Sequence, residues 1–212
     1  MTIECTPASG NSRALDKTNL HMSKRMLHLW IRAEQRKNEK RVAITPQDAS
    51  KLICKGIKVT VEESNDRIIS AKEYHTVGCE IAKQHSWPRA PKNTTILGLK
   101  ELSDDVEKLE HKHIMFGHAF KGQTSGLKIL KKFKAGKGLL YDLEYLTDSE
   151  GRRLAAFGYW AGYAGAAVSL KAYADQQKTK GICGPVSVFE NKEKMANYIR
   201  NAFVNVENKF PK

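Results

Sequence analysis

The sequence predicts an α/β fold with a mostly parallel, open sheet and flanking helices. Short apolar runs alternate with helical patterns in the order β-α-β-α-β-β-α-β-α, which is typical of parallel strands joined by crossover connections. The composition agrees, because 41% of the 212 residues are hydrophobic and 28% are charged, as in ordinary globular proteins. We therefore expect an α/β lobe over residues 26–158.

The first strand and helix are predicted from clear local signals. Residues 27–31 (LHLWI) form a short apolar run that suits a strand. Thr45 is a favourable N-cap and Pro46 suits the first helical position, so a helix is expected over 46–55. Gly56 follows and is a common helix stop.

The next two elements are a strand and a short helix. Residues 57–62 (IKVTVE) alternate and are rich in β-branched side chains, which predicts a strand. Ser70 is expected to cap a helix over 71–77, which Gly78 ends. A loop is expected from there to the next strand.

The second half of the lobe continues the alternation. A helix is expected over 124–134 and a strand over 138–141. After a turn, small residues over 152–177 predict one long helix, and 190–209 predict a last, polar helix.

Two strands in the middle of the chain are each followed by an ionisable residue. The apolar run 95–99 precedes Lys100 and Glu101, and the run 113–117 precedes His118. The charged stretch between the runs is long enough for a crossover, so both strands should end at the same edge of the sheet. Ligands bind at that edge in open α/β sheets. These side chains are candidate acid/base groups, or alternatively a solvated rim.

Glu144 follows the strand predicted at 138–141 in the same way. It can reach the edge that carries Lys100 and His118, because parallel strands end together. A structural salt bridge is the equally simple alternative for this carboxylate.

The charge of the chain favours an anionic partner. There are 36 Lys and Arg residues against 23 Asp and Glu, a formal net charge of +13. The dense stretch 128–137 (KILKKFKAGK) has apolar residues at helical spacing, so its lysines are most simply a solvated helix face. Since no RNA- or DNA-binding motif is present, an acidic small molecule is preferred over nucleic acid.

The cysteine and histidine spacings give weak metal signals. No CxxC or Cys/His ligand pattern occurs, so we expect no metal site and a reduced, cytoplasmic compartment. His111 and His113 could share a strand face, but no third ligand is near in sequence. The four cysteines are scattered over the chain: Cys5, Cys54, Cys79 and Cys183.

We expect neither a secretory signal at residues 1–25 nor a membrane helix in the sequence. Residues 1–25 have no apolar core and are expected to form a disordered extension. No run reaches the roughly 18 apolar residues of a membrane helix, so no membrane partner is expected.

The glycines of FGYWAGYAGAA do not form a dinucleotide-binding motif. Gly158, Gly162 and Gly165 are spaced GxxxGxxG, whereas the nucleotide fingerprint is GxGxxG after a strand. Close helix packing is the expected reason for these glycines. Neither GxGxxG, a P-loop nor GxSxG occurs in the sequence.

Six segments together resemble one enzyme family. The chain is similar to the N-terminal part of the lysine-forming, NAD-dependent saccharopine dehydrogenases, relatives of alanine dehydrogenase and transhydrogenase. The resemblance covers roughly residues 27–172. The matching segments are RAEQRKNEKRVAITP, KGIKVTVEES, TTILGLKEL, HIMFGHAFKGQ, GLLYDLEYL and GRRLAAFGYWAGYAGAA.

The resemblance implies a reaction and catalytic roles. Such enzymes oxidise saccharopine with NAD to an imine, which water splits into lysine and 2-oxoglutarate in the aminoadipate route of lysine biosynthesis. Lys100 matches the lysine that handles the proton of the secondary amine, and His118 matches the acid/base of the hydrolysis. Glu101 and Glu144 match acids that tune this pair.

The resemblance also implies binding residues. Arg41, Gln123, Arg153 and Phe157 match residues that contact the substrate, and Arg152 matches an arginine that approaches the cofactor. Arginine suits a substrate with several carboxylates, because its guanidinium pairs with a carboxylate through two hydrogen bonds.

The chain also departs from the family pattern. KNEK stands at 37–40 where relatives usually carry a proline, and the sequence stops at FPK, where relatives begin a Rossmann lobe that holds NAD. The resemblance thus implies one lobe of a two-lobed enzyme, with 159–212 as a helical connection and weak activity alone. The alternative is a truncated, non-catalytic remnant that binds an acidic metabolite or a partner subunit.

Overall fold

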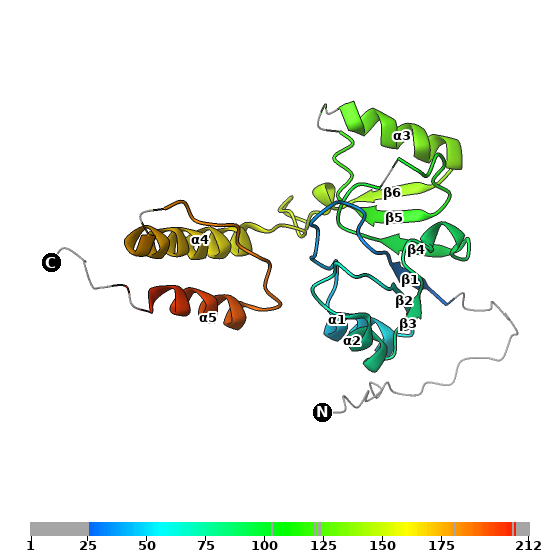
Figure 1. The fold of residues 1–212 in the computed structure, drawn as a ribbon. Coiled ribbons are helices and arrows are strands. Elements are labelled where there is room, and N and C mark those ends of the chain that lie inside the picture. Colours follow the sequence, from blue (N-terminus) through cyan, green and yellow to red (C-terminus); the bar gives the residue numbers. More distant parts are fainter. Residues whose placement is uncertain are drawn as a thin grey trace, which may run out of the picture.

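A computed structural model shows an α/β lobe and, apart from it, a pair of helices (Figure 1). The extension expected at 1–25 lies outside the described residues. The structure describes residues 26–102, 104–120, 122, 124–179, 181–204 and 206.

A six-stranded parallel sheet forms the centre of the lobe, which confirms the predicted fold class. The strand order is β3-β2-β1-β4-β5-β6. β1 is central, and His28 lies opposite Lys58 of β2 and Thr94 of β4. The strands are β1 (His28–Ile31), β2 (Lys58–Glu62), β3 (Glu80–Ala82), β4 (Thr94–Leu97), β5 (Lys112–Met115) and β6 (Leu139–Asp142).

The helices follow the predicted start signals. Thr45 Oγ1 accepts a hydrogen bond from the Asp48 amide at 3.2 Å, and Glu73 reaches back to the Ser70 amide at 3.1 Å, so both predicted caps form. The helices are α1 (Pro46–Cys54), α2 (Ala71–Thr76), α3 (Thr124–Gly136), α4 (Gly158–Thr179) and α5 (Lys192–Phe203), with short 3₁₀ turns at Trp87–Arg89 and Leu143–Tyr145.

The sheet separates two hydrophobic clusters. Neighbouring residues of β4 point to opposite faces, with Ile96 in one cluster and Leu97 in the other. α3 covers the Ile96 face through Ile129 and Phe133, while α1 and α2 cover the other face. Both faces are therefore buried, as expected for a parallel sheet.

The sequence analysis missed one strand and misplaced two helix ends by several residues. β3 lies at Glu80–Ala82, where a loop was expected, and the last helix ends at Phe203 rather than near 209. The long helix begins at Gly158 and not at Arg152. Residues before Gly158 are held in a turn instead, because Thr147 and Arg153 form an antiparallel bridge.

The helix pair has a small cluster of its own. Ala167 of α4 packs with Met195 and Ile199 of α5. A side chain at Gly162 or Gly165 would meet nothing within 4 Å in the described structure, so the close packing expected for these glycines is not found. The division into a lobe at 26–158 and a connection at 159–212 stays a prediction.

The helices can be compared with the length of a membrane span. Within the part of the chain that the structure describes, none is both long and apolar enough to cross a membrane.

Candidate active site at the carboxyl ends of the strands

The strand order reverses direction at β1. The chain runs outward from β1 through β2 to β3, and then crosses back to β4 on the other side of β1. Such a reversal of direction is a topological switch point, where the loops after the two strands separate and leave room for a ligand. The loops that follow β1 and β4 carry Arg32, Glu34, Arg41, Lys100 and Glu101.

Lys100 lies just beyond β4 and is held by side chains from the segment that follows β1. Glu34 accepts hydrogen bonds from the Leu99 amide at 2.7 Å and from the Lys100 amide at 3.0 Å. Arg32 donates to the Lys100 carbonyl. The lysine is half-buried, and its peptide groups are fixed by the neighbouring strand.

Glu101 joins the ends of β4 and β5. Its carboxylate lies 3.8 Å from His118 Nε2 and 3.5 Å from Arg36 Nη1. The His118 ring also stacks on Phe116, with ring centroids 6.4 Å apart. The structure thus brings Glu101, which directly follows Lys100, to His118.

Glu144 lies beside the same edge and pairs with Arg153. Their side chains are 3.2 Å apart, with the carboxylate more buried than the guanidinium. The salt bridge that was the simpler alternative for Glu144 is therefore present. Because its partner is a predicted substrate residue, the bridge also links the β6 end to the binding side of the site.

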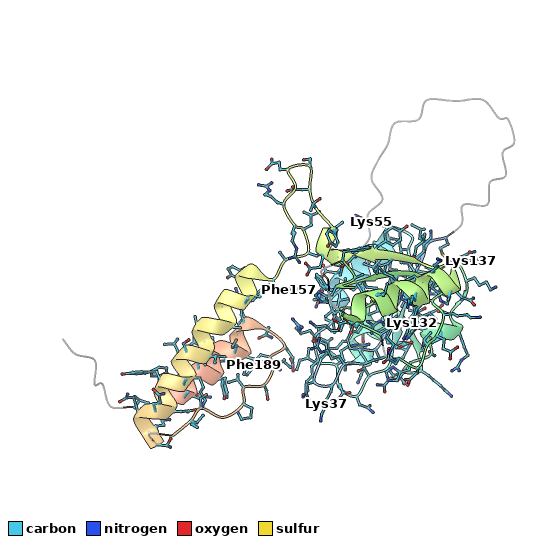
Figure 2. All side chains as sticks on the ribbon, turned by 90° about the horizontal axis from the view of Figure 1, so that it is seen from above. Lys37, Lys55, Lys132, Lys137, Phe157 and Phe189 are labelled. Carbon is cyan, nitrogen blue, oxygen red and sulfur yellow. The ribbon has the colours of Figure 1, made fainter. Side chains whose placement is uncertain are left out.

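Arg41 and Phe157 are connected to His118 through aromatic contacts. The Arg41 guanidinium lies over the Phe157 ring, 5.6 Å from its centroid, and Phe157 is 5.5 Å from Phe116. Phe116 in turn contacts His118. Figure 2 shows Phe157 where the chain leaves the lobe and enters α4. Two of the predicted substrate residues thus gather near His118.

Arg41 is paired with Glu39 in the same loop. Two of its nitrogens lie 2.6 and 2.8 Å from the two carboxylate oxygens. The hydrogen bonds from Arg41 lower the pKa of Glu39, and the nearby charge of Lys100 adds to the effect. Glu39 correspondingly raises the pKa of Arg41. Arg41 and Lys100 therefore place two positive charges around one carboxylate.

Arg152 lies with a different set of partners. Its side chain is 72% exposed and pairs with Asp148 at 2.9 Å and Glu150 at 3.1 Å, both in the turn before α4. Gln123, the remaining predicted substrate residue, lies outside the described residues.

His111 and His113 serve the core of the lobe. His111 Nε2 lies 3.0 Å from the Ala90 carbonyl. The His113 ring packs edge-on against Trp87 and Phe133, and burial lowers its pKa to about 3. No group of three or more His, Cys, Asp or Glu side chains suited to a metal ion occurs in the described ranges.

The lysines of α3 follow the sequence prediction only in part. Lys128 and Lys132 pair with Asp104 at 2.6 and 3.5 Å, while Ile129 and Phe133 of the same helix are buried. Figure 2 labels Lys132 on this helix and Lys137 just after it. The side chain of Lys128 is 59% exposed and that of Lys132 only 12%, so the solvated face predicted for the basic stretch holds for Lys128 but not for Lys132.

Sequence reasoning noticed the charges after the first strand but gave no role to Glu34 and Arg32. Their partners are the peptide groups of Leu99 and Lys100, more than 60 residues away. A cluster of charges directly after a central strand was the only available signal. Charges at that place in a sequence indicate side chains that stabilise the loops at the switch point.

The fold and the site define a parallel α/β lobe that carries ionisable groups at a switch point of its sheet. The chain belongs to the family "Alanine dehydrogenase/PNT, N-terminal domain", whose model matches residues 30–164. The expected relationship to this family is thereby confirmed.

Known relatives include two fungal enzymes. The chain is 47% identical over 150 residues to "Saccharopine dehydrogenase [NAD(+), L-lysine-forming]" of Schizosaccharomyces pombe, covering 70% of this chain and 41% of the relative. It is 48% identical to the protein of the same name from Emericella nidulans, covering 70% and 40%. The chain therefore spans less than half the length of these relatives.

A solved structure supports the fold independently. An L-alanine dehydrogenase aligns with a TM-score of 0.57 at 14% identity, over 73% of this chain and 43% of that chain. At this identity the likeness concerns the fold alone.

Proposed function

We propose that this chain is the substrate-binding and catalytic lobe of a saccharopine dehydrogenase. The reaction is the NAD-dependent oxidative cleavage of saccharopine to L-lysine and 2-oxoglutarate. The carrying observation is the contact of Glu101 with His118 next to Lys100, at the switch point of the sheet. The fungal relatives with this name, 47% and 48% identical, support the assignment.

In this proposal the two basic groups act on successive steps. The amine of Lys100 takes the proton of the substrate's secondary amine as the neighbouring carbon is oxidised. His118 takes a proton from the water that attacks the resulting imine, and later returns one to the departing amine of lysine. Glu101, 3.8 Å from His118, stabilises the imidazolium formed between these steps.

Binding is assigned to the arginines. Arg41 and Arg153 each lie against a carboxylate, Glu39 and Glu144, within 3.2 Å. A substrate carboxylate would share or replace these partners, since a guanidinium donates hydrogen bonds to two oxygens in one plane. Phe157 and Gln123 complete the proposed substrate contacts.

NAD is part of the proposal and supplies the hydride acceptor when bound. Arg152 is the residue of this chain assigned to it, and its exposed guanidinium is accessible to an anionic group. The acids Asp148 and Glu150 neutralise it here, so Arg152 provides only a rim of that site. A cytoplasmic role in lysine biosynthesis belongs to the same proposal.

Calorimetry with saccharopine and with 2-oxoglutarate tests this function. We expect the unaltered chain to bind, and Arg153→Ala to weaken binding by roughly 10- to 100-fold, the value of a charge-assisted hydrogen bond. Arg200→Ala on α5 is the matched control, since Arg200 is exposed and donates a hydrogen bond to Asn197 of its own helix. Binding that ignores the Arg153 change would count against the proposed site.

A further inference from the structure

Glu34 makes a set of contacts that a surface carboxylate does not need. Its side chain is only 8% exposed. One oxygen accepts from the Leu99 amide at 2.7 Å and the other from the Lys100 amide at 3.0 Å. Both oxygens are thus used on two successive peptide groups of the segment that presents Lys100.

Arg32 completes the arrangement from the same strand end. Its side chain is fully buried, and one nitrogen lies 3.3 Å from Glu34 while the other donates to the Lys100 carbonyl. Burial lowers the pKa of Arg32, and the charge of Glu34 opposes that shift. The carboxylate therefore both orients the guanidinium and compensates its buried charge.

Gly98 makes room for this pair. A Cβ at this position would lie 2.4 Å from Arg32 Nε, too close for any side chain. The Gly98 amide also bonds to the Ile114 carbonyl at 3.0 Å, so the segment continues the parallel pairing toward Lys100. The packing of glycine against arginine fixes the distance between the loops after β1 and β4.

We propose that Glu34, oriented by Arg32, is a positioning residue for Lys100. Glu34 binds the peptide group before the lysine Cα and Arg32 binds the carbonyl after it, so that the amine leaves the strand end in one direction. This inference rests on the proposed function for the role of Lys100. The positioning itself can be tested without any ligand.

A similar contact, between a carboxylate and backbone amides, exists beside His118. Asp142 Oδ1 accepts from the Gly117 amide at 3.2 Å and from the Glu144 amide at 3.0 Å. Gly117 is crowded, since a Cβ there would lie 2.9 Å from Leu140. Each candidate acid/base residue thus follows a backbone segment that is anchored by a carboxylate at or just beyond the end of the adjoining strand.

The test replaces Glu34 by its nearest isostere, Glu34→Gln, which removes the charge and leaves one acceptor oxygen. We expect the amides of Leu99 and Lys100 to exchange with solvent about tenfold faster or more. We also expect the pH profile for acetylation of the Lys100 amine, resolved by mass spectrometry, to shift. Glu107→Gln, an exposed loop carboxylate, is the matched control and should change neither.

Each outcome has a defined meaning. Faster amide exchange with an unchanged Lys100 profile would make Glu34 merely structural and overturn the proposal, as would unchanged exchange. If both readouts shift, positioning stands whatever the affinity for saccharopine, whereas the proposed function fails separately if Arg153→Ala leaves that affinity unchanged. Should Glu34→Gln not fold, Glu34→Asp keeps the charge but cannot span both amides, and the same shifts are expected from it.

Discussion

The α/β lobe and the α4–α5 pair bury their side chains very differently. The lobe encloses large and polar groups, including Trp87, Tyr74 and Glu62, each at most 1% exposed. In the helix pair the cluster is small, and α4 leaves Tyr159 72% and Trp160 53% exposed. The lobe has a hydrophobic core of its own, whereas most of the surface of α4 faces solvent.

Glu62 illustrates how the lobe supports a buried charge. Its two oxygens accept hydrogen bonds from the indole of Trp30 and from the amides of Ala33, His85 and Trp87, at 2.6 to 3.0 Å. Four donors satisfy a carboxylate that would otherwise be costly to bury. We therefore expect the stability of the protein to depend mainly on the lobe, and changes on α4 to have little effect on that stability.

The largest expected effect comes from the centre of the sheet. Ile96→Ala removes a buried side chain from β4 and should lower the free energy of unfolding by about 2–5 kcal/mol. Urea denaturation followed by far-ultraviolet circular dichroism measures it. Leu170→Ala, half exposed on α4, is the control and should change the midpoint little. Equal effects of the two changes would break the comparison.

A smaller effect on the stability of the lobe is expected when the pH is lowered, because of the buried His113. Burial holds its folded pKa at about 3, against 6.5 in the unfolded chain. Below pH 6.5 the unfolded state binds a proton that the folded state does not. Stability should therefore fall as pH falls toward 3, by at most about 1.4 kcal/mol per pH unit from this group.

The His113 prediction is checked by denaturation at several pH values. His113→Phe should flatten the pH dependence between pH 6 and 4, since an aromatic ring of similar shape remains between Trp87 and Phe133. His75→Gln, on the exposed side of α2, should leave the slope as it is. An unchanged slope in His113→Phe would show that other groups dominate acid unfolding.

The smallest effect is expected on α4. Trp160 contacts Tyr159 and Tyr163 edge-on at 5.0 and 5.9 Å but remains largely exposed. Trp160→Ala should change the free energy of unfolding by about 0.5 kcal/mol or less, as for ordinary surface positions. A loss as large as that of Ile96→Ala would mean that the helix pair contributes to the stability of the lobe.

Much of the lobe could be predicted because its signals are local. Thr45 and Pro46 mark the start of α1, and the alternation of 57–62 marks β2. The order of elements then fixes a parallel sheet, which is enough to place the ends of β4 and β5 at one edge. Lys100 and His118 follow from that placement without any knowledge of contacts.

The parts that were missed depend on contacts distant in sequence or on side-chain pairing. β3 has only three residues and owes its pairing to β2. The start of α4 is delayed because Asp148 and Arg152 close a turn. Glu34 and the Lys100 amide that it binds are 66 residues apart in sequence, and no periodicity in the sequence indicates this hydrogen bond.

The most direct test of the central claim is a nuclear magnetic resonance titration with saccharopine. The account predicts that the side-chain signals of Lys100 and His118 shift together with one dissociation constant. The signal of His28, which lies at the amino end of β1 between Thr60 and Thr94, should stay in place. Shifts confined to one of the two residues, or centred on His28, would contradict a shared site at the carboxyl edge.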